Sequence, residues 1–418
     1  MYRFCSFKIL MIVFTAILSS CTAQTIPTQP PQPPDEYFSN ALDWIETHSV
    51  KINTVDWATV REQALNLAPN PQTTADTYPA MLFVMEQLRD SVTWFSTPDE
   101  VNKPYADPGM MAFYPEAIIM WMSADGPADR VGLRVGDVIE TINGEPPRPF
   151  QGTPFLEMYK DLTIQMTVRR ASQAEPITVQ LKKVMSPPQQ SKPIGRLIRT
   201  EQGGVGYLEL RVESGAGERY PTLAQQLIRE ADQAGACGWI IDLRRNHSGD
   251  IWSYIAAIGP ILGEGEVGGF RYLDGTRELW KYQDAKVFWG NQEREESLVE
   301  GQIYKLKQSL PPVALLTSRA TMAAGELAVV TFQGRAKVRS FGEPTGGSPF
   351  LVYWTGLSDG AWLGVSGAFS VDRTGQVYDG PITPNEIIVI NWSLFGEDND
   401  PVILAARDWL LDQPDCLR

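Results

Sequence analysis

The sequence has few of the side chains that bind transition metals. Its 418 residues include only two histidines, His48 and His247, and four cysteines. The HExxH and CxxC spacings are absent, so a zinc-type site would have to consist almost wholly of carboxylates. We therefore expect no metal and no cofactor.

An excess of positive charge is also missing. The chain carries 36 Lys and Arg against 50 Asp and Glu, for a formal net charge of −14. A nucleic-acid-binding protein needs a basic surface, so nucleic acid is excluded as a partner. A hydrophobic content of 43% with 10% aromatic residues is instead typical of a folded protein with two or three domains.

The apolar run at the N-terminus is too short to cross a membrane. It covers about ten residues, 9–18, behind Arg3 and Lys8, which predicts a cleaved signal peptide over 1–20. The sequence LSSC that ends it resembles the lipobox of bacterial lipoproteins, in which the cysteine, here Cys21, is lipidated. The alternative is an ordinary secreted protein in which the small residues Ser19 and Ser20 mark the cleavage site. We favour a lipoprotein anchored at the outer surface of an envelope membrane, on its periplasmic or extracellular side.

The segment after the lipobox, 21–35, predicts an extended tether. It has prolines at 27, 30, 31, 33 and 34, which favour a polyproline II spacer. Farther along, Cys237 precedes an apolar strand and is interpreted as a buried thiol. A disulfide between Cys237 and Cys416 stays open, because an oxidising envelope would permit it.

Three segments with different hydrophobic patterns follow the tether. Residues 36–104 carry three apolar stripes at helical spacing and predict three short helices, with Asp56 as the N-cap of the second and Pro79 in the first turn of the third. Residues 105–185 change to strands and turns. Residues 194–418 alternate strands, at 205–210, 239–243, 313–317 and 338–342, with helices at 223–231, from 251 and at 322–332. This alternation predicts a layered, largely parallel α/β core, with the 239–243 strand central and Asp400 capping a terminal helix.

The second segment resembles a PDZ domain. The string GPADRVGLRVGDVI at 126–139 runs into Ile142, Asn143 and Gly144, as a short helix, a Gly-Asp turn, a strand and an Asn-Gly hairpin turn would. PDZ domains add a peptide as a strand to a sheet edge and hold its C-terminal carboxylate. The resemblance implies such a partner, and the alternative is a PDZ fold kept only as a rigid cover.

The order of helices, PDZ domain and α/β core resembles the tail-specific, or C-terminal-processing, serine peptidases of family S41. The motifs are GVGYL at 204–208, DLRRNHSG at 242–249, TMAAGE at 321–326 and FGEPTG at 341–346. The resemblance covers nearly all of 36–411. It implies a multidomain α/β fold with a crotonase-like or ClpP-like core and a serine-type peptidase chemistry.

The positions that carry catalysis in that family are substituted here. The nucleophilic serine lies three residues before the glutamate that matches Glu326, which places Ala323 there. The family's base is a lysine, at a position held by Ser348, or in tricorn-like members a histidine, at a position held by Val92. Ser91 matches the residue that supports this histidine. The oxyanion hole implied by the resemblance uses the Ala324 N–H and the turn at Ser248 and Gly249.

No other residue of the motifs offers a clear replacement. Thr321 is interpreted as the N-cap of the following helix, and Ser318 and Ser348 have no identifiable base. We expect His247 to face solvent in its turn and Lys337 to belong to a solvated face.

Three functional hypotheses remain. The first is an envelope lipoprotein that has lost catalysis and binds extended or C-terminal peptide segments through its PDZ domain and cleft. The second is an active serine peptidase that cleaves unfolded or tail-marked proteins with a nucleophile elsewhere. The third is a structural scaffold. We favour the first, because nucleophile and base positions far apart in sequence are both substituted.

Overall fold

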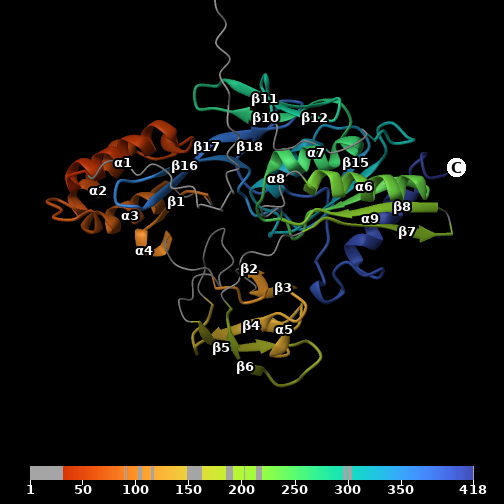
Figure 1. The fold of residues 1–418 in the computed structure, drawn as a ribbon, viewed down its shortest axis with the longest axis horizontal. Helices are drawn as coiled ribbons and strands as arrows, with labels where there is room; N and C mark the ends of the chain where they lie inside the picture. The colour runs from red at the N-terminus through yellow and green to blue at the C-terminus, as the bar shows by residue number, and fades with distance from the viewer. Residues whose placement is uncertain are drawn as a thin grey trace, which may run out of the picture.

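The computed structural model describes residues 32–88, 90, 92–101, 106–113, 117–147, 162–184, 192–201, 203–212, 219–294, 299 and 304–417. The predicted signal peptide, Cys21, most of the tether and Ser91 lie outside these residues. Among the helices described, none has the length and apolar character needed to span a bilayer. The chain has the multidomain α/β fold predicted from the sequence, with N-terminal helices on the left, the PDZ domain below and the α/β core on the right in Figure 1.

The N-terminal segment forms the three predicted helices. The Asp56 carboxylate caps the second by accepting the Thr59 N–H at 3.3 Å, and Pro79 lies in the first turn of the third. The three helices pack their apolar faces on Leu363 and Val365 of a core strand. The elements are α1 (Pro34–His48), η1 (Ile52–Thr54), α2 (Trp57–Leu67), η2 (Thr74–Thr77) and α3 (Tyr78–Leu88).

An antiparallel sheet joins this segment to the core. The first strand after the helices, β1, pairs with β17, so the chain enters the core sheet before it reaches the PDZ domain through α4 (Pro98–Val101). The strand order is β1-β17-β10-β11-β12-β13, and β16 and β18 also pair with β17. The strands are β1 (Trp94–Ser96), β10 (Gly265–Arg271), β11 (Arg277–Gln283), β12 (Lys286–Trp289), β13 (Gln292–Glu293), β16 (Phe350–Gly356), β17 (Trp362–Val371) and β18 (Val377–Tyr378).

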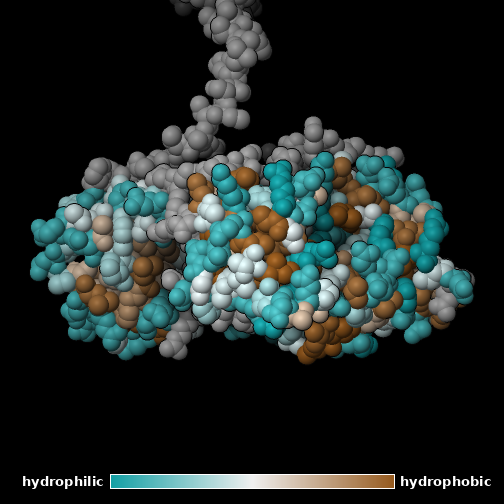
Figure 2. Space-filling model, turned by 90° about the horizontal axis from the view of Figure 1, so that it is seen from below, coloured by the Kyte–Doolittle hydropathy of each residue, from teal (hydrophilic) through white to brown (hydrophobic). Residues whose placement is uncertain are grey.

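The PDZ domain is a five-stranded sheet with β2 at one edge. Asn143 and Gly144 have φ of 53° and 86°, as a two-residue turn with positive φ at both central residues requires, so the predicted hairpin is confirmed. Figure 2 shows the whole molecule from below, and on this face hydrophobic residues form separate patches among hydrophilic ones. The elements are β2 (Met110–Phe113), β3 (Ile118–Met122), α5 (Pro127–Arg130), β4 (Val138–Ile142), β5 (Thr163–Arg169) and β6 (Ile177–Lys182), in the order β2-β3-β4-β5-β6.

The core sheet is parallel except at one edge, and helices cover both faces. Trp239 and Ile241 of β9 pack with α6, α7 and α8, whereas Ile240 packs with α9 on the opposite face. The strand order β19-β15-β14-β9-β8-β7 places β9 inside the sheet, as predicted. The elements are β7 (Ile194–Thr200), β8 (Gly203–Glu209), α6 (Arg219–Gln233), β9 (Ala236–Asp242), α7 (Ile251–Leu262), β14 (Val313–Thr317), α8 (Ala324–Phe332), β15 (Val338–Gly342), β19 (Glu386–Ile387), η5 (Trp392–Leu394) and α9 (Pro401–Leu411).

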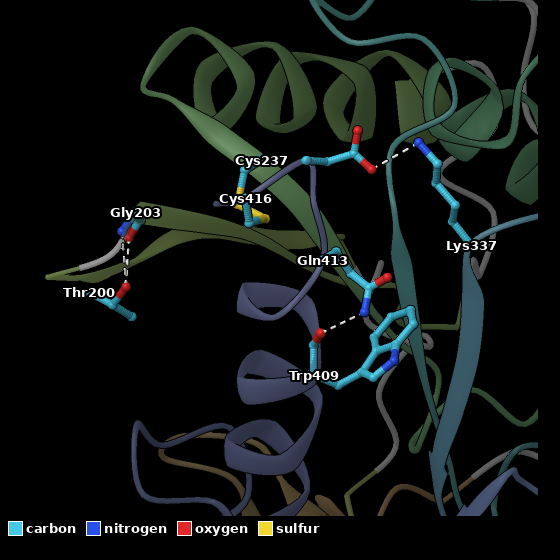
Figure 3. Close-up of a disulfide and its surroundings, with 8 residues drawn as sticks. Thr200, Gly203, Cys237, Lys337, Trp409, Gln413 and Cys416 are labelled. Carbon is cyan, nitrogen blue, oxygen red and sulfur yellow. Dashed lines mark hydrogen bonds and ion pairs between the residues drawn. A yellow bond between two sulfur atoms is a disulfide. The ribbon is translucent and has the colours of Figure 1, made fainter. Parts of the chain in front are cut away.

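Cys237 is not a free thiol, contrary to the interpretation from sequence. It forms a disulfide with Cys416, 179 residues away, with 5.0 Å between the two Cα atoms. Helix α9 packs under β9 and returns the chain to the start of that strand, where Figure 3 shows the bond. Lys337 lies nearby and forms an ion pair with Asp415 at 2.8 Å.

Candidate active site

The candidate site lies where β9 and β14 end and α8 begins. Two hydroxyls fix the turn between β14 and α8: Ser318 Oγ donates to the Arg244 carbonyl at 2.6 Å and Thr321 Oγ1 to the Leu243 carbonyl at 2.9 Å. The sequence analysis interpreted Thr321 as the N-cap of α8, and this interpretation is wrong. The helix begins at Ala324, two residues later than predicted, and Ala323 occupies the N-cap position.

Ala323 has a strained backbone. Its φ of 46° and ψ of −120° lie in a left-handed region that residues with a Cβ rarely adopt. A strand-to-helix turn of this kind projects a side chain at the helix N-terminus, which is how such folds present a nucleophile. Here the side chain is a methyl group, which has no lone pair to attack a carbonyl. The Ala323 N–H donates to Ser348 Oγ at 3.0 Å.

A buried carboxylate fixes the loop that carries Ser348. Glu326, in the first turn of α8, accepts hydrogen bonds from Thr345 Oγ1 at 2.5 Å, from the Gly347 N–H at 2.8 Å, and from the Ser348 N–H and Oγ at 2.6 and 2.8 Å. Burial raises the pKa of Glu326, while these donors oppose the shift. Ser348, at the position that the sequence analysis assigned to the family's lysine, is itself buried and bridges Glu326 and Ala323. The sequence alone did not reveal this bridge.

The predicted oxyanion turn packs against the start of α8. The Asn246 carbonyl accepts the Met322 N–H at 2.9 Å, and a Cβ built on Gly325 would lie 2.2 Å from the same oxygen. Only glycine permits this approach. Ser248 and Gly249 follow Asn246 and are exposed. Their role with the Ala324 N–H in an oxyanion hole stays a prediction.

Val92 lies in a turn fixed to the antiparallel sheet. The Asp90 carboxylate accepts the Val92 N–H at 2.9 Å and Ser366 Oγ of β17 at 2.7 Å. Ser366 is opposite Val352 of β16, the strand that follows Ser348. The sheet thus connects the Val92 turn to the Ser348 loop, but an apolar side chain at Val92 cannot accept a proton.

His247 is partly buried, contrary to the expectation of a freely exposed side chain. The side chain is partly enclosed beside the turn, and desolvation lowers the pKa of His247 to about 4. The imidazole is therefore neutral at pH 7.

Behind the turn lies a buried cluster of charged and aromatic residues that the sequence did not predict. The Arg244 guanidinium forms ion pairs with Asp242 at 2.7 Å and Asp400 at 2.8 Å, and all three side chains are inaccessible to solvent. Asp400 also caps α9, as predicted, by accepting the Val402 N–H at 3.0 Å. The Phe395 ring lies 4.3 Å from the Arg244 guanidinium. This cluster fixes the strand end from which the turn departs.

The PDZ domain contacts the core next to this cluster. Arg245 lies 3.9 Å from the Phe395 ring, forms an ion pair with Glu209 at 2.6 Å and donates to the Met120 carbonyl of β3 at 3.5 Å. A Cβ on Gly136 would lie 2.2 Å from Ser393 Oγ, so PDZ backbone and core are closely packed here. Within the described parts of the chain, no group of three or more His, Cys, Asp or Glu side chains is arranged to hold a metal ion.

The sequence matches two family descriptions. Residues 204–388 match peptidase family S41, and residues 118–154 match the PDZ domain. The nisin-resistance protein of Lactococcus lactis subsp. lactis is 29% identical over 151 residues, which cover 35% of this chain and 45% of that protein. The chloroplastic carboxyl-terminal-processing peptidase 2 of Arabidopsis thaliana is 22% identical over 364 residues, 79% of this chain and 65% of that protein. The matched parts thus span less than two thirds of either relative.

Solved structures share the fold over most of the chain. The photosystem II D1 C-terminal processing protease aligns with a TM-score of 0.62 at 18% identity, over 92% of this chain and 99% of that one. A lipoprotein from Streptococcus agalactiae aligns with a TM-score of 0.55 at 14% identity, over 92% and 98%. The chain therefore has the same fold as these structures over most of its length, and part of it matches the PDZ domain. Residues 204–388, most of the α/β core, are thus similar to peptidase family S41 in sequence, and the chain shares its fold with the solved structures above.

Proposed function

We propose that this chain is a catalytically inactive member of peptidase family S41, which binds extended or C-terminal peptide segments without cutting them. The observation that carries the proposal is the strained turn at Ala323, where the backbone geometry remains but the side chain is a methyl group. Ser348, at the position of one possible base, is a hydroxyl bound to Glu326. Val92, at the other, is apolar. Neither a nucleophile nor a base is available at the family's positions.

Peptide binding is supported by the PDZ sheet and by the relatives. Strand β2 is at the edge of its sheet, so its outer backbone groups can pair with an added strand. One relative is a carboxyl-terminal-processing peptidase, a class of enzyme that must bind a chain near its carboxyl end. We infer the same kind of ligand for this chain.

A location in the bacterial cell envelope is part of the proposal. Disulfides such as Cys237–Cys416 persist in oxidising compartments outside the cytosol. A solved structure of similar fold is a lipoprotein, and the LSSC sequence offers Cys21 for lipidation. We propose that the lipid holds the protein at the outer surface of a membrane and that the PDZ domain and cleft face peptides there.

The test is to incubate the mature chain, kept soluble by Cys21→Ser, with a mixture of unfolded polypeptides and to examine the mixture by mass spectrometry. We expect retained peptides that share a C-terminal pattern and no new termini. New termini that persist through repurification, and that disappear on replacing Ser318, Thr321 or Ser348 with alanine, would show an active peptidase instead.

The alternative of an active peptidase has one observation in its favour. Ser348 Oγ donates to the Glu326 carboxylate at 2.8 Å, which is a hydroxyl beside a possible base. However, Ser348 is 1% exposed, and its oxygen already accepts the Ala323 N–H. Attack on a substrate carbonyl would require this loop to open.

A further inference from the structure

Three tryptophans gather on one face of the antiparallel sheet. Trp94 of β1 and Trp354 of β16 are both directly opposite Gly364 of β17, and Trp362 precedes Gly364 by two residues. Directly opposite residues, and residues two apart, point to the same face of a sheet. The Trp354 and Trp362 ring centroids are 5.0 Å apart, and a Cβ on Gly364 would lie 2.4 Å from Trp94 Nε1. We call Trp94, Trp354 and Trp362 the tryptophan platform.

The platform is accessible to solvent although the other face of the same strands is buried. Trp354 is 56% and Trp94 36% exposed. On the opposite face, Phe95 and Leu363 pack against the N-terminal helices. Large aromatic side chains clustered on an exposed face are characteristic of binding surfaces. The N-terminal helices pack on the other face, so contact with them does not explain the tryptophans.

We propose that the tryptophan platform binds a polyproline II segment, and that its occupant is the proline-rich segment 22–33 of the same chain. Prolines at 27, 30 and 33 recur every third residue. Polyproline II has three residues per turn, so these three rings would lie along the same edge of the helix and repeat about every 9 Å. Trp94 and Trp354 project from the strands on either side of β17, about 9 to 10 Å apart at their backbones. The proline repeat is therefore similar to the distance between the two strands that carry these tryptophans.

The end of the segment that the structure describes has the required conformation and position. Pro33 has φ of −55° and ψ of 144°, close to polyproline II values. Helix α1 begins at the next residue, and its Tyr37 packs in one cluster with Leu357 and Ala361, at the hairpin between β16 and β17. Trp362 directly follows this hairpin. Twelve residues of polyproline II span about 37 Å, enough to pass from α1 across the platform.

The chemistry of the segment also fits. Residues 22–34 carry no charged side chain, so ring packing and hydrogen bonds would hold the segment rather than ion pairs. Proline rings pack on aromatic faces, and indole N–H groups can donate to polyproline II carbonyls, which have no partners within their own helix. Prolines favour the extended polyproline II conformation, so we expect binding of such a segment to lose little conformational entropy.

Hydroxyl-radical footprinting tests the proposal on the mature chain carrying Cys21→Ser. The test variant is Pro27→Ser with Pro30→Ser, which removes two prolines from the proposed contact edge. The matched control is Gln29→Ser with Pro31→Ser, which changes the other edges. We expect oxidation of Trp94 and Trp354 to rise several-fold in the test variant and to stay at the parent level in the control. Equal oxidation in all three proteins would overturn the proposal.

A second measurement examines the contact from the other side. In Trp354→Ala, a nonspecific protease should cleave segment 22–33 several-fold faster than in the parent, with circular dichroism confirming the fold. Protection should also persist after tenfold dilution and in 1 M salt. Protection that falls on dilution would mean that a second copy supplies the segment, which contradicts binding within one chain. The outcome is independent of whether the candidate active site cleaves peptides.

Discussion

At the scale of single residues, Ala323 retains a conformation suited to presenting a nucleophile. Its N–H is held by Ser348 Oγ and its carbonyl accepts the Leu327 N–H at 3.0 Å, so both neighbouring peptide groups are fixed. Strain of this kind costs about 1–3 kcal/mol and persists only where the surroundings impose it. The turn thus holds a strained strand-to-helix backbone around a methyl side chain.

Replacing Ala323 with glycine should stabilise the protein. Glycine adopts φ of 46° without a Cβ clash, so we expect Ala323→Gly to raise the free energy of unfolding by about 1 kcal/mol. The control is Ala328→Gly inside α8, which should lower it by about 1 kcal/mol or more. Urea unfolding measures both. A loss at position 323 as large as that at 328 would contradict a strained turn.

His247 should make stability depend on pH. Its pKa is lowered to about 4 in the folded protein, against roughly 6.5 in an unfolded chain. Between these values the unfolded state binds the proton and the folded state does not, so stability falls as the pH drops from about 6.5 to 4.

The pH effect can be isolated by substitution. The free energy of unfolding of the parent should fall between pH 7 and pH 4.5. In His247→Gln this decrease should be smaller by on the order of 2 kcal/mol. Glu326 acts in the opposite direction, since its raised pKa favours the folded state as the carboxylate becomes protonated. Identical pH profiles for the parent and His247→Gln would show that the imidazole is not desolvated.

At the scale of elements, the start of α8 depends on a close approach that only glycine allows. A Cβ on Gly325 would lie 2.2 Å from the Asn246 carbonyl oxygen. Alanine is normally the better helix residue, but here we expect Gly325→Ala to lower the free energy of unfolding by about 2 kcal/mol. Gly380→Ala is the control, because no atom lies within 4 Å of a Cβ there. Thermal unfolding of both variants is the measurement. Equal stability of Gly325→Ala and Gly380→Ala would disprove the clash.

The elements themselves were predictable because their signals are local. Apolar stripes and buried runs marked the three N-terminal helices and strands β9, β14 and β15. The start of α8 was placed two residues early, because Met and Ala are good helix formers and nothing near them in sequence reveals that Ser348 holds Ala323. The Arg244–Asp400 ion pair and the Cys237–Cys416 bond join segments more than 150 residues apart. Such pairings follow from packing and not from local pattern.

At the scale of the whole molecule, the disulfide closes a very long loop. The bond joins residues 179 apart. In the chain-entropy model, this cross-link raises the free energy of the unfolded state by about 5 kcal/mol. Reduction should therefore lower the thermal unfolding temperature by several degrees. In Cys416→Ser the temperature should already be low and should not respond to reductant. A parent protein that unfolds at the same temperature with and without reductant would argue against the bond.

Arg245 is a direct contact between the PDZ domain and the turn of the candidate site. This side chain touches the Met120 carbonyl of β3, and it belongs to the same turn as Ser248 and Gly249. Strand β3 pairs with the edge strand β2, so Arg245 lies one strand away from the PDZ edge that we propose binds peptide. Suppose that a ligand bound at the PDZ edge changes the affinity of the turn for a second ligand by some factor. Thermodynamic linkage then requires that the second ligand change the affinity of the PDZ edge by the same factor. Any such coupling that passes through the Arg245 guanidinium would act equally in both directions.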